Sequence, residues 1–199
     1  MNEIIFKNYT EIPLNRREAF RYMRVKEPDE TLEKLFETCL EESKPFLTYK
    51  VCFREFSVIK NGDDLDLGFA KTKSKNLAVN LKDCNKIVLF AATVGHGVDR
   101  LIKKEELLSP AKAVCLQAIG SERVESLCDF FNEELKNEYA EKGILLKPRF
   151  SPGYGDFSLE LQKDIIPALN CTNLLGISLG ENLMMSPSKS VTAIIGIYK

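Results

Sequence analysis

A regular apolar stripe across residues 110–142 constrains the fold of this chain more than any other feature. Apolar or small residues recur there at steps of three or four positions: Ala113, Leu116, Gly120, Val124, Leu127, Phe131 and Leu135. This spacing places them on one face of an α-helix. Ser109 suits the N-cap, Pro110 the first helical position and Gly143 the position after the last turn. The pattern therefore predicts one long helix, over about residues 109–142, as the spine of the chain.

Strands are predicted wherever the sequence is β-rich or apolar without interruption. The segments are residues 3–6, 47–60, 86–92, 174–179 and 190–198. The run at 86–92 has no polar residue after Lys86, which is typical of a strand buried on both faces.

Shorter helices are predicted at residues 15–25, 28–43, 73–82 and 158–169. Asn15 stands three positions before Glu18, which is the spacing of a capping box, and Pro28 suits the first turn of the next helix. Together with the strands, these helices predict an α+β fold. We expect a mainly antiparallel, twisted sheet packed against helices, the long one included.

The charge balance excludes some classes of function. The chain has 28 Lys and Arg residues against 29 Asp and Glu residues, for a net charge of −1. A nucleic-acid-binding protein usually carries a basic excess or stripe. No apolar run has the length of a transmembrane helix or the character of a signal peptide. We therefore expect a cytoplasmic protein that binds neither nucleic acid nor a membrane.

The cysteine pattern argues against a metal site. The six cysteines are Cys39, Cys52, Cys84, Cys115, Cys128 and Cys171. They form no close pair, and His96 is the only histidine. Zinc sites usually draw on close pairs of Cys or His. We therefore predict buried free thiols in a reducing compartment, and no metal centre.

Two short motifs point to chemistry that the rest of the sequence does not support. The Gly-His-Gly sequence at 95–97 has Arg100 where a dinucleotide-binding loop has its third glycine. The Ser-Pro-Ser-Lys sequence at 186–189 fits the Ser-x-x-Lys pattern of serine acylases but lacks the companion motifs. We interpret the first as a strand-to-helix turn and the second as a turn into the last strand. No catalytic nucleophile or general base is predicted.

The segment at residues 148–156 is the strongest candidate for a ligand loop. Two prolines and two glycines stiffen it and allow a ligand to approach its backbone closely. Arg149 offers a planar fork for a carboxylate, and Tyr154 offers a ring and a hydroxyl. The alternative is a structural loop that closes the long helix onto the sheet.

This loop also carries a family resemblance. The sequence RFSPGYGD at residues 149–156 resembles the R-x-x-P-G-Y loop in the activation domain of cobalamin (vitamin B12)-dependent methionine synthase. Residues 175–177 and 184–192 (MMSPSKSVT) are similar to the segments that follow in that family, and residues 91–95 and 120–133 to those that precede. Phe150 and Gly155 stand where that loop usually has proline.

The resemblance implies a stand-alone S-adenosylmethionine-binding domain over residues 1–199. Residues 1–70 would supply N-terminal helices and strands, and residues 75–199 the ligand-binding core. In that family the domain supplies the methyl donor for reductive reactivation of oxidised cobalamin, while a flavodoxin-like protein supplies the electron. The expected partner is a cobalamin-bearing methionine synthase or related corrinoid protein. The chain itself would position the sulfonium methyl group and contribute no nucleophile.

The resemblance also implies roles for individual residues. Arg149 would bind the methionyl carboxylate, and Tyr154 would pack on the ligand or hydrogen-bond to it. Backbone groups of Ser151, Pro152 and Gly153 would line the site. Glu125 would accept hydrogen bonds from the ligand's amino group or hydroxyls, with Glu122 as the alternative one helical turn away. An exposed helix glutamate is the structural alternative for Glu125.

Two further functions stay open at this point. One is a docking or chaperone subunit of a corrinoid methyltransferase that does not bind S-adenosylmethionine. The other is an unrelated small-molecule-binding domain.

Overall fold

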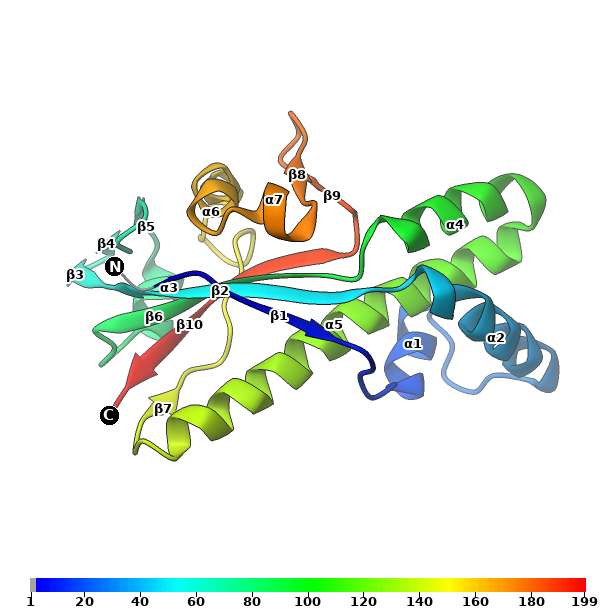
Figure 1. Cartoon of the computed structure of the whole chain (residues 1–199), viewed down its shortest axis with the longest axis horizontal. Helices are drawn as coiled ribbons and strands as arrows, with labels where there is room; N and C mark the ends of the chain where they lie inside the picture. The colour runs from blue at the N-terminus through cyan, green and yellow to red at the C-terminus, as the bar shows by residue number, and fades with distance from the viewer. Residues whose placement is uncertain (1–2) are drawn as a thin grey trace.

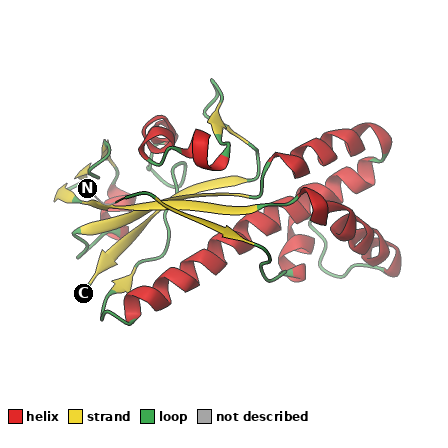
Figure 2. Cartoon of the chain, viewed as in Figure 1, coloured by secondary structure: helices red, strands yellow, loops and turns green. Residues whose placement is uncertain are grey.

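The computed structural model describes residues 3–199 and centres on a twisted antiparallel sheet (Figures 1 and 2). Its strands, in spatial order, are β1 (Ile5–Tyr9), β2 (Tyr49–Ser57), β6 (Lys86–Thr93), β10 (Ser190–Tyr198) and β7 (Leu145–Leu146). Every neighbouring pair in this sheet is antiparallel. Two small sheets pair β3 (Ile59–Asn61), β4 (Asp64–Asp66) and β5 (Lys71–Lys73), and β8 (Ser178–Leu179) with β9 (Met185–Ser186).

Helices cover both faces of the central sheet (Figure 1). Their bounds are α1 (Arg16–Tyr22), α2 (Glu30–Ser43), α3 (Lys75–Asn80), α4 (His96–Leu108), α5 (Pro110–Ala140), α6 (Gln162–Ala168) and α7 (Cys171–Leu175), with short 3₁₀ turns η1 (Lys44–Phe46) and η2 (Leu159–Leu161). The predicted α+β class, with a mainly antiparallel sheet and one long helix, is confirmed.

The strand β6 explains why its sequence is apolar at every position. Val88, Phe90 and Ala92 pack in the core on the α5 side, whereas the residues between them pack in a second core formed with α3, α6 and α7. Side chains alternate across a strand, so a strand between two helical layers must be apolar on both faces. The prediction of a fully buried strand at 86–92 is confirmed from Ile87 onward.

The long helix α5 carries the predicted stripe. All seven stripe residues, from Ala113 to Leu135, are buried. Ser109 is the N-cap residue, Pro110 opens the helix, and Gly143 has a φ of +67° after its end. Phe131 packs against Phe53 of β2 and Phe90 of β6, with ring centroids 5.2 and 5.1 Å apart. These contacts fix α5 across one face of the sheet.

Some predicted element bounds differ from the structure. The first strand lies at Ile5–Tyr9 and not at 3–6. The second helix begins at Glu30 and not at Pro28, because the Asp29 carboxylate caps it by accepting from the Leu32 N–H at 2.8 Å. The segment 174–179 is only partly a strand: residues 171–175 form α7, which ends at Gly176 with a φ of +71°. A short apolar run is compatible with either structure, and here the left-handed glycine decides the break.

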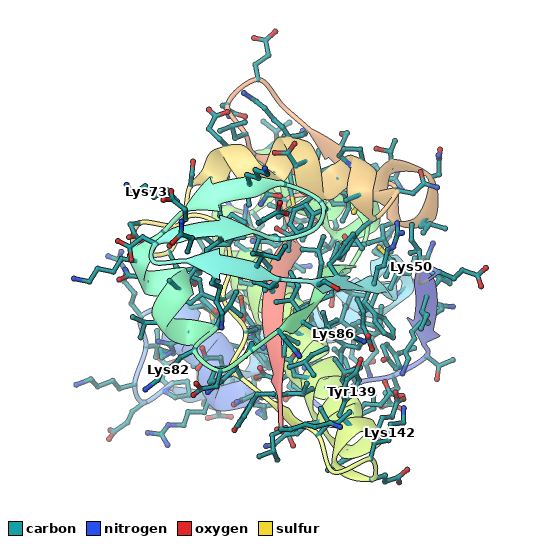
Figure 3. All side chains as sticks on the ribbon, turned by 90° about the vertical axis from the view of Figure 1, so that its left-hand side faces the viewer. Lys50, Lys73, Lys82, Lys86, Tyr139 and Lys142 are labelled. Carbon is teal, nitrogen blue, oxygen red and sulfur yellow. The ribbon has the colours of Figure 1, made fainter. Side chains whose placement is uncertain are left out.

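Figure 3 looks onto the end of the molecule that carries β3–β5 and the last turn of α5. Lysine side chains are prominent there, but acidic and aromatic groups accompany them. Lys86 lies 3.4 Å from Glu55, and the ammonium of Lys142 lies 5.5 Å from the ring centroid of Tyr139.

All six cysteines are free and buried. No helix within residues 3–199 combines the length and the hydrophobicity needed to span a membrane.

Candidate functional site

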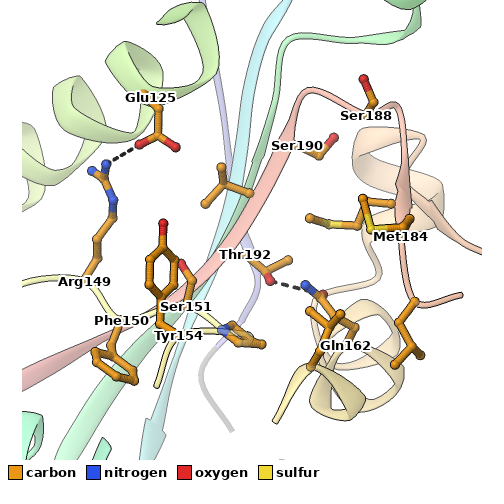
Figure 4. Close-up of a pocket in the computed structure, with 15 residues that line it drawn as sticks. Glu125, Arg149, Phe150, Ser151, Tyr154, Gln162, Met184, Ser188, Ser190 and Thr192 are labelled. Carbon is orange, nitrogen blue, oxygen red and sulfur yellow. Dashed lines mark hydrogen bonds and ion pairs between the residues drawn. The ribbon is translucent and has the colours of Figure 1, made fainter. Parts of the chain in front are cut away.

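A cavity of about 410 Å³ opens between α5, the loop at residues 148–158, and the segment that joins β8 to β10 (Figure 4). Its lining contains five of the six predicted site residues: Glu125, Arg149, Ser151, Pro152 and Tyr154. The other lining residues are Phe150, Leu159, Gln162, Leu183, Met184, Met185, Ser188, Ser190, Val191 and Thr192. Cavities of about 300–1,000 Å³ hold drug-sized ligands, so this one has room for a small molecule.

Backbone pairing fixes the start of the loop on the sheet. The Phe150 N–H donates to the Ile194 carbonyl at 2.8 Å, and the Ile194 N–H donates back at 2.9 Å. Proline has no N–H, so this pairing accounts for a non-proline residue at position 150. The following residues form tight turns, in which the Tyr154 N–H bonds the Ser151 carbonyl and the Gly153 N–H bonds the Phe157 carbonyl.

The end of the loop is bound to the helix α3. The Asp156 carboxylate accepts hydrogen bonds from the Ser74 hydroxyl at 2.5 Å and from the N–H groups of Lys75 and Asn76 at 2.8 and 3.1 Å. The Ser74 bond, aided by these backbone donors, holds the pKa of Asp156 below its ordinary value. Gly155 has a φ of +56°, and a Cβ there would collide with the Asn76 side chain, which accounts for glycine at this position.

Arg149 reaches from the loop to two carboxylates on α5. Its Nη2 lies 2.7 Å from Glu125 Oε2, and its Nη1 lies 2.5 Å from Asp129 Oδ1. Burial disfavours the charged guanidinium, but nearby negative groups, including these carboxylates, more than offset this, so the pKa of Arg149 is raised. The structure therefore brings the two predicted charged residues, Arg149 and Glu125, together at one end of the cavity (Figure 4).

Glu122, the alternative to Glu125, lies outside the cavity lining. It is fully buried, and its carboxylate accepts from Arg123, from the Ser126 hydroxyl and from the Asn15 N–H. Arg123 in turn donates to the carbonyls of Ile12 and Pro13. This network fastens the N-terminal segment to α5, so the surroundings of Glu122 are those of a structural residue.

Two predicted loop residues differ in how they meet the cavity. Gly153 does not line it: its φ of +92° lets the chain turn between the flanking residues that do. Tyr154 lines it but is 67% exposed, so its ring stands at the mouth with room for a ligand to pack against it.

The opposite wall is the segment at residues 184–192, and two residues outside this segment, Asp99 and Thr93, hold it in place. The Asp99 carboxylate of α4 accepts from both the N–H and the hydroxyl of Ser188, at 2.6 and 2.8 Å. The Ser190 hydroxyl donates to the Thr93 hydroxyl at the end of β6 at 2.8 Å. The α4 helix, which begins at the strand-to-helix turn, therefore positions one wall of the site.

The two rejected motifs have structural roles. At the Gly-His-Gly turn, Gly95 has a φ of +86°, as the turn interpretation requires, and His96 Nε2 lies 3.0 Å from the Gly176 carbonyl. In the Ser-x-x-Lys motif, Lys189 donates to Ser121 of α5 at 3.0 Å, and burial lowers its pKa.

Four features of the site were not predicted from the sequence: Asp129, Gln162, Thr192 and the methionine pair Met184–Met185. Asp129 was missed, although its place one helical turn after Glu125 was a usable signal. Gln162, which is hydrogen-bonded to Thr192 at 3.1 Å, carries no signal that marks it as a site residue. Thr192, Met184 and Met185 lie in the segment 184–192 that resembles the family, but no role in the site was predicted for them.

The arrangement is suited to binding rather than to covalent catalysis. The cation of Arg149 and the carboxylate of Glu125 both line the cavity, with Asp129 bound to Arg149 outside the lining, and this pair matches a ligand with a carboxylate and an ammonium group. The rest of the lining includes the apolar side chains of Leu159, Leu183, Met184 and Met185. Within residues 3–199, no cluster of three or more potential metal ligands was found.

Comparison with protein-family models gave no match, and comparison with curated protein sequences gave none either. Among solved structures, the crystal structure of the MetH reactivation domain bound to AdoHcy (S-adenosylhomocysteine) matches with a TM-score of 0.72. The match covers 98% of this chain and 78% of that chain, at 16% sequence identity. The chain therefore has the fold of the MetH reactivation domain, the methionine synthase domain that its loop sequence resembles.

Proposed function

We propose that this chain binds S-adenosylmethionine in the cavity between Arg149 and Met184. It would serve as a reactivation protein for a partner that carries cobalamin, either methionine synthase or a related corrinoid methyltransferase. The single observation that carries the proposal is the convergence of Arg149, Glu125 and the 151–154 loop on one cavity in a fold whose solved counterpart holds AdoHcy. No side chain of this chain has to act as a nucleophile in this role.

Each part of the ligand has a matching part of the site. The methionyl carboxylate would replace a protein carboxylate on Arg149, and the ligand's ammonium would bind Glu125. The sulfonium would lie near the 151–154 loop, whose turns leave backbone close to the cavity. The protein's contribution would be to orient the sulfonium methyl group toward a partner's cobalamin, with AdoHcy as the leaving group, while a flavodoxin-like donor would supply the electron that reduces the cobalamin.

Calorimetric titration with S-adenosylmethionine tests the proposal. Wild-type protein should bind with a Kd in about the micromolar to sub-millimolar range, and Arg149→Ala should reduce the affinity by roughly tenfold or more. Arg16→Ala is the matched control, because Arg16 also bridges two carboxylates, Glu33 and Glu37, but lies outside the cavity. Equal losses in both variants, or no binding by wild type, would contradict the proposal.

One observation favours a second function, a docking subunit that binds the corrinoid protein without S-adenosylmethionine. Arg149 already has two carboxylate partners within the chain, so no ligand is needed to satisfy it. Under this alternative, wild type shows no heat with S-adenosylmethionine. Both wild type and Arg149→Ala would then bind a purified cobalamin-bearing methionine synthase equally well.

A further inference from the structure

The end of the cavity away from Arg149 contains a buried amide with one unused atom. Gln162, at the start of α6, is only 3% exposed and lines the cavity. Its Oε1 accepts a hydrogen bond from the Thr192 hydroxyl at 3.1 Å, and Thr192 is itself 2% exposed. Within residues 3–199, this bond to Oε1 is the only hydrogen bond of the Gln162 side chain, and Nε2 is not among the fully buried atoms that lack a partner, so Nε2 is open to the cavity. Figure 4 shows Gln162 and Thr192 meeting on the side of the cavity opposite Glu125 and Arg149.

The Thr192 bond decides what the amide offers to a ligand. Because the oxygen is held by a hydroxyl donor, the nitrogen is the half of the amide left for the cavity. A ligand acceptor placed against this N–H would replace its contact with water by a hydrogen bond inside the cavity, which is a modest net gain. The amide therefore selects for an acceptor atom and against a donor.

The surfaces around this amide are apolar and adaptable. Met184 lies on the same side of the cavity as Gln162 (Figure 4), and Leu159, Leu183 and Met185 also line the cavity. Thioether side chains adjust their shape readily and make favourable contacts with aromatic rings. A flat ring could place its faces against these side chains and its edge against Gln162 (Figure 4).

We propose that this end of the cavity is the subsite for the adenine of the ligand, and that Gln162 Nε2 donates a hydrogen bond to one of its ring nitrogens. Thr192 is a positioning residue, which fixes the orientation of the amide. The assignment rests on the proposed function, since it takes S-adenosylmethionine as the ligand. It adds a specificity-determining residue at the opposite end from the charged cluster.

Calorimetry with AdoHcy and its 1-deaza, 3-deaza and 7-deaza analogues tests the assignment, because each analogue replaces one ring nitrogen by C–H. Wild type should bind one of the three roughly 3- to 10-fold more weakly than AdoHcy. In Gln162→Met, which keeps the length of the side chain but has no amide, this difference should vanish. Gln162→Glu, which lacks the N–H but is of equal size, should also abolish the difference in affinity. This variant replaces Gln162→Met in the test if the Met variant does not fold.

Two further variants separate a direct role from a structural one. Thr192→Val should reduce the discrimination between AdoHcy and the sensitive analogue, a ratio that lost stability alone would not change. Gln117→Met, on the exposed surface of α5, is the matched control and should retain the wild-type ratio.

If the Gln162 variants keep that ratio, or if wild type binds all three analogues as tightly as AdoHcy, the assignment is wrong while the proposed function stands. If wild type does not bind AdoHcy, both are wrong.

Discussion

The guanidinium of Arg149 lies 2.7 Å from the carboxylate of Glu125, a residue 24 positions earlier on α5. Asp129, one turn further along the helix, lies 2.5 Å from the other terminal nitrogen of the same guanidinium. Two carboxylates therefore share one cation before a ligand arrives. A ligand carboxylate must displace at least one of them, and the two acidic residues are expected to affect binding in opposite directions.

The Asp129→Asn variant should bind S-adenosylmethionine more tightly than wild type. The Asp129 side chain is 71% exposed, so it competes for Arg149 only weakly, and the gain should be about 1.5- to 5-fold. Glu125→Gln changes the charge equally but removes the group proposed to bind the ligand's ammonium. We expect its affinity to fall by roughly tenfold. Calorimetry compares them, and a change in the same direction for both would contradict the assignment.

The Asp156→Asn variant should lose stability in a pH-dependent manner. The pKa of Asp156 is lowered from 3.8 in the folded protein, so its contribution to stability is fully present above that value and is lost as the pH falls through the folded pKa. The difference in Tm between wild type and variant should therefore be constant at neutral pH and shrink below about pH 4. Thermal melts across the acid range measure it, and a difference that persists undiminished in strong acid would contradict the prediction.

Gly155→Ala should disturb the loop more than Gly143→Ala does. Both glycines have positive φ, at +56° and +67°, so each substitution incurs the backbone penalty of about 1–2 kcal/mol. Only Gly155 faces a neighbour, the Asn76 side chain, whereas a Cβ at Gly143 would meet nothing within 4 Å. Denaturant unfolding should show the larger loss for Gly155→Ala. Its ligand affinity should also fall, while Gly143→Ala binds as wild type does.

Arg123→Met should destabilise the fold without changing the affinity of the folded protein for ligand. It would leave the fully buried Glu122 carboxylate without its cation, at a cost of about 3–5 kcal/mol. The double variant Glu122→Leu/Arg123→Met should recover part of that loss, because no unpaired charge remains. Denaturant melts give the stabilities and calorimetry the affinities. A loss of ligand affinity without a loss of stability in these variants would indicate that Glu122 acts in the binding site.

The two elements predicted best have a periodicity that only one structure satisfies. A strand could not bury the same seven residues that α5 buries, because their spacing of three and four positions fits one face of a helix. The unbroken apolar run of β6 fits a strand only where the sheet is covered on both faces. The α7 helix is different: five residues do not establish a period, and the helix ends because Gly176 adopts the left-handed conformation, with a φ of +71°.

The candidate site likewise contains some residues that the sequence predicted and others that it did not. Arg149 and Tyr154 were predictable because the stiff loop that carries them has a distinctive composition. Gln162 and Thr192 were not, because a glutamine at a helix start and a threonine in a strand are ordinary until the fold places them side by side at 3.1 Å. Asp99 anchors the opposite wall from a helix 89 positions away from Ser188, a relationship that spacing alone does not reveal.

The pairing of Arg149 with two helix carboxylates also has an evolutionary consequence. Asp129 lies on the exposed side of a helix whose core contacts are made elsewhere, so its replacement leaves the buried stripe untouched. If the chain binds S-adenosylmethionine as proposed, natural variation at this single surface position would change ligand affinity without a new fold or a new binding residue. Homologous proteins that work at different cellular concentrations of the methyl donor should differ here before they differ at Arg149.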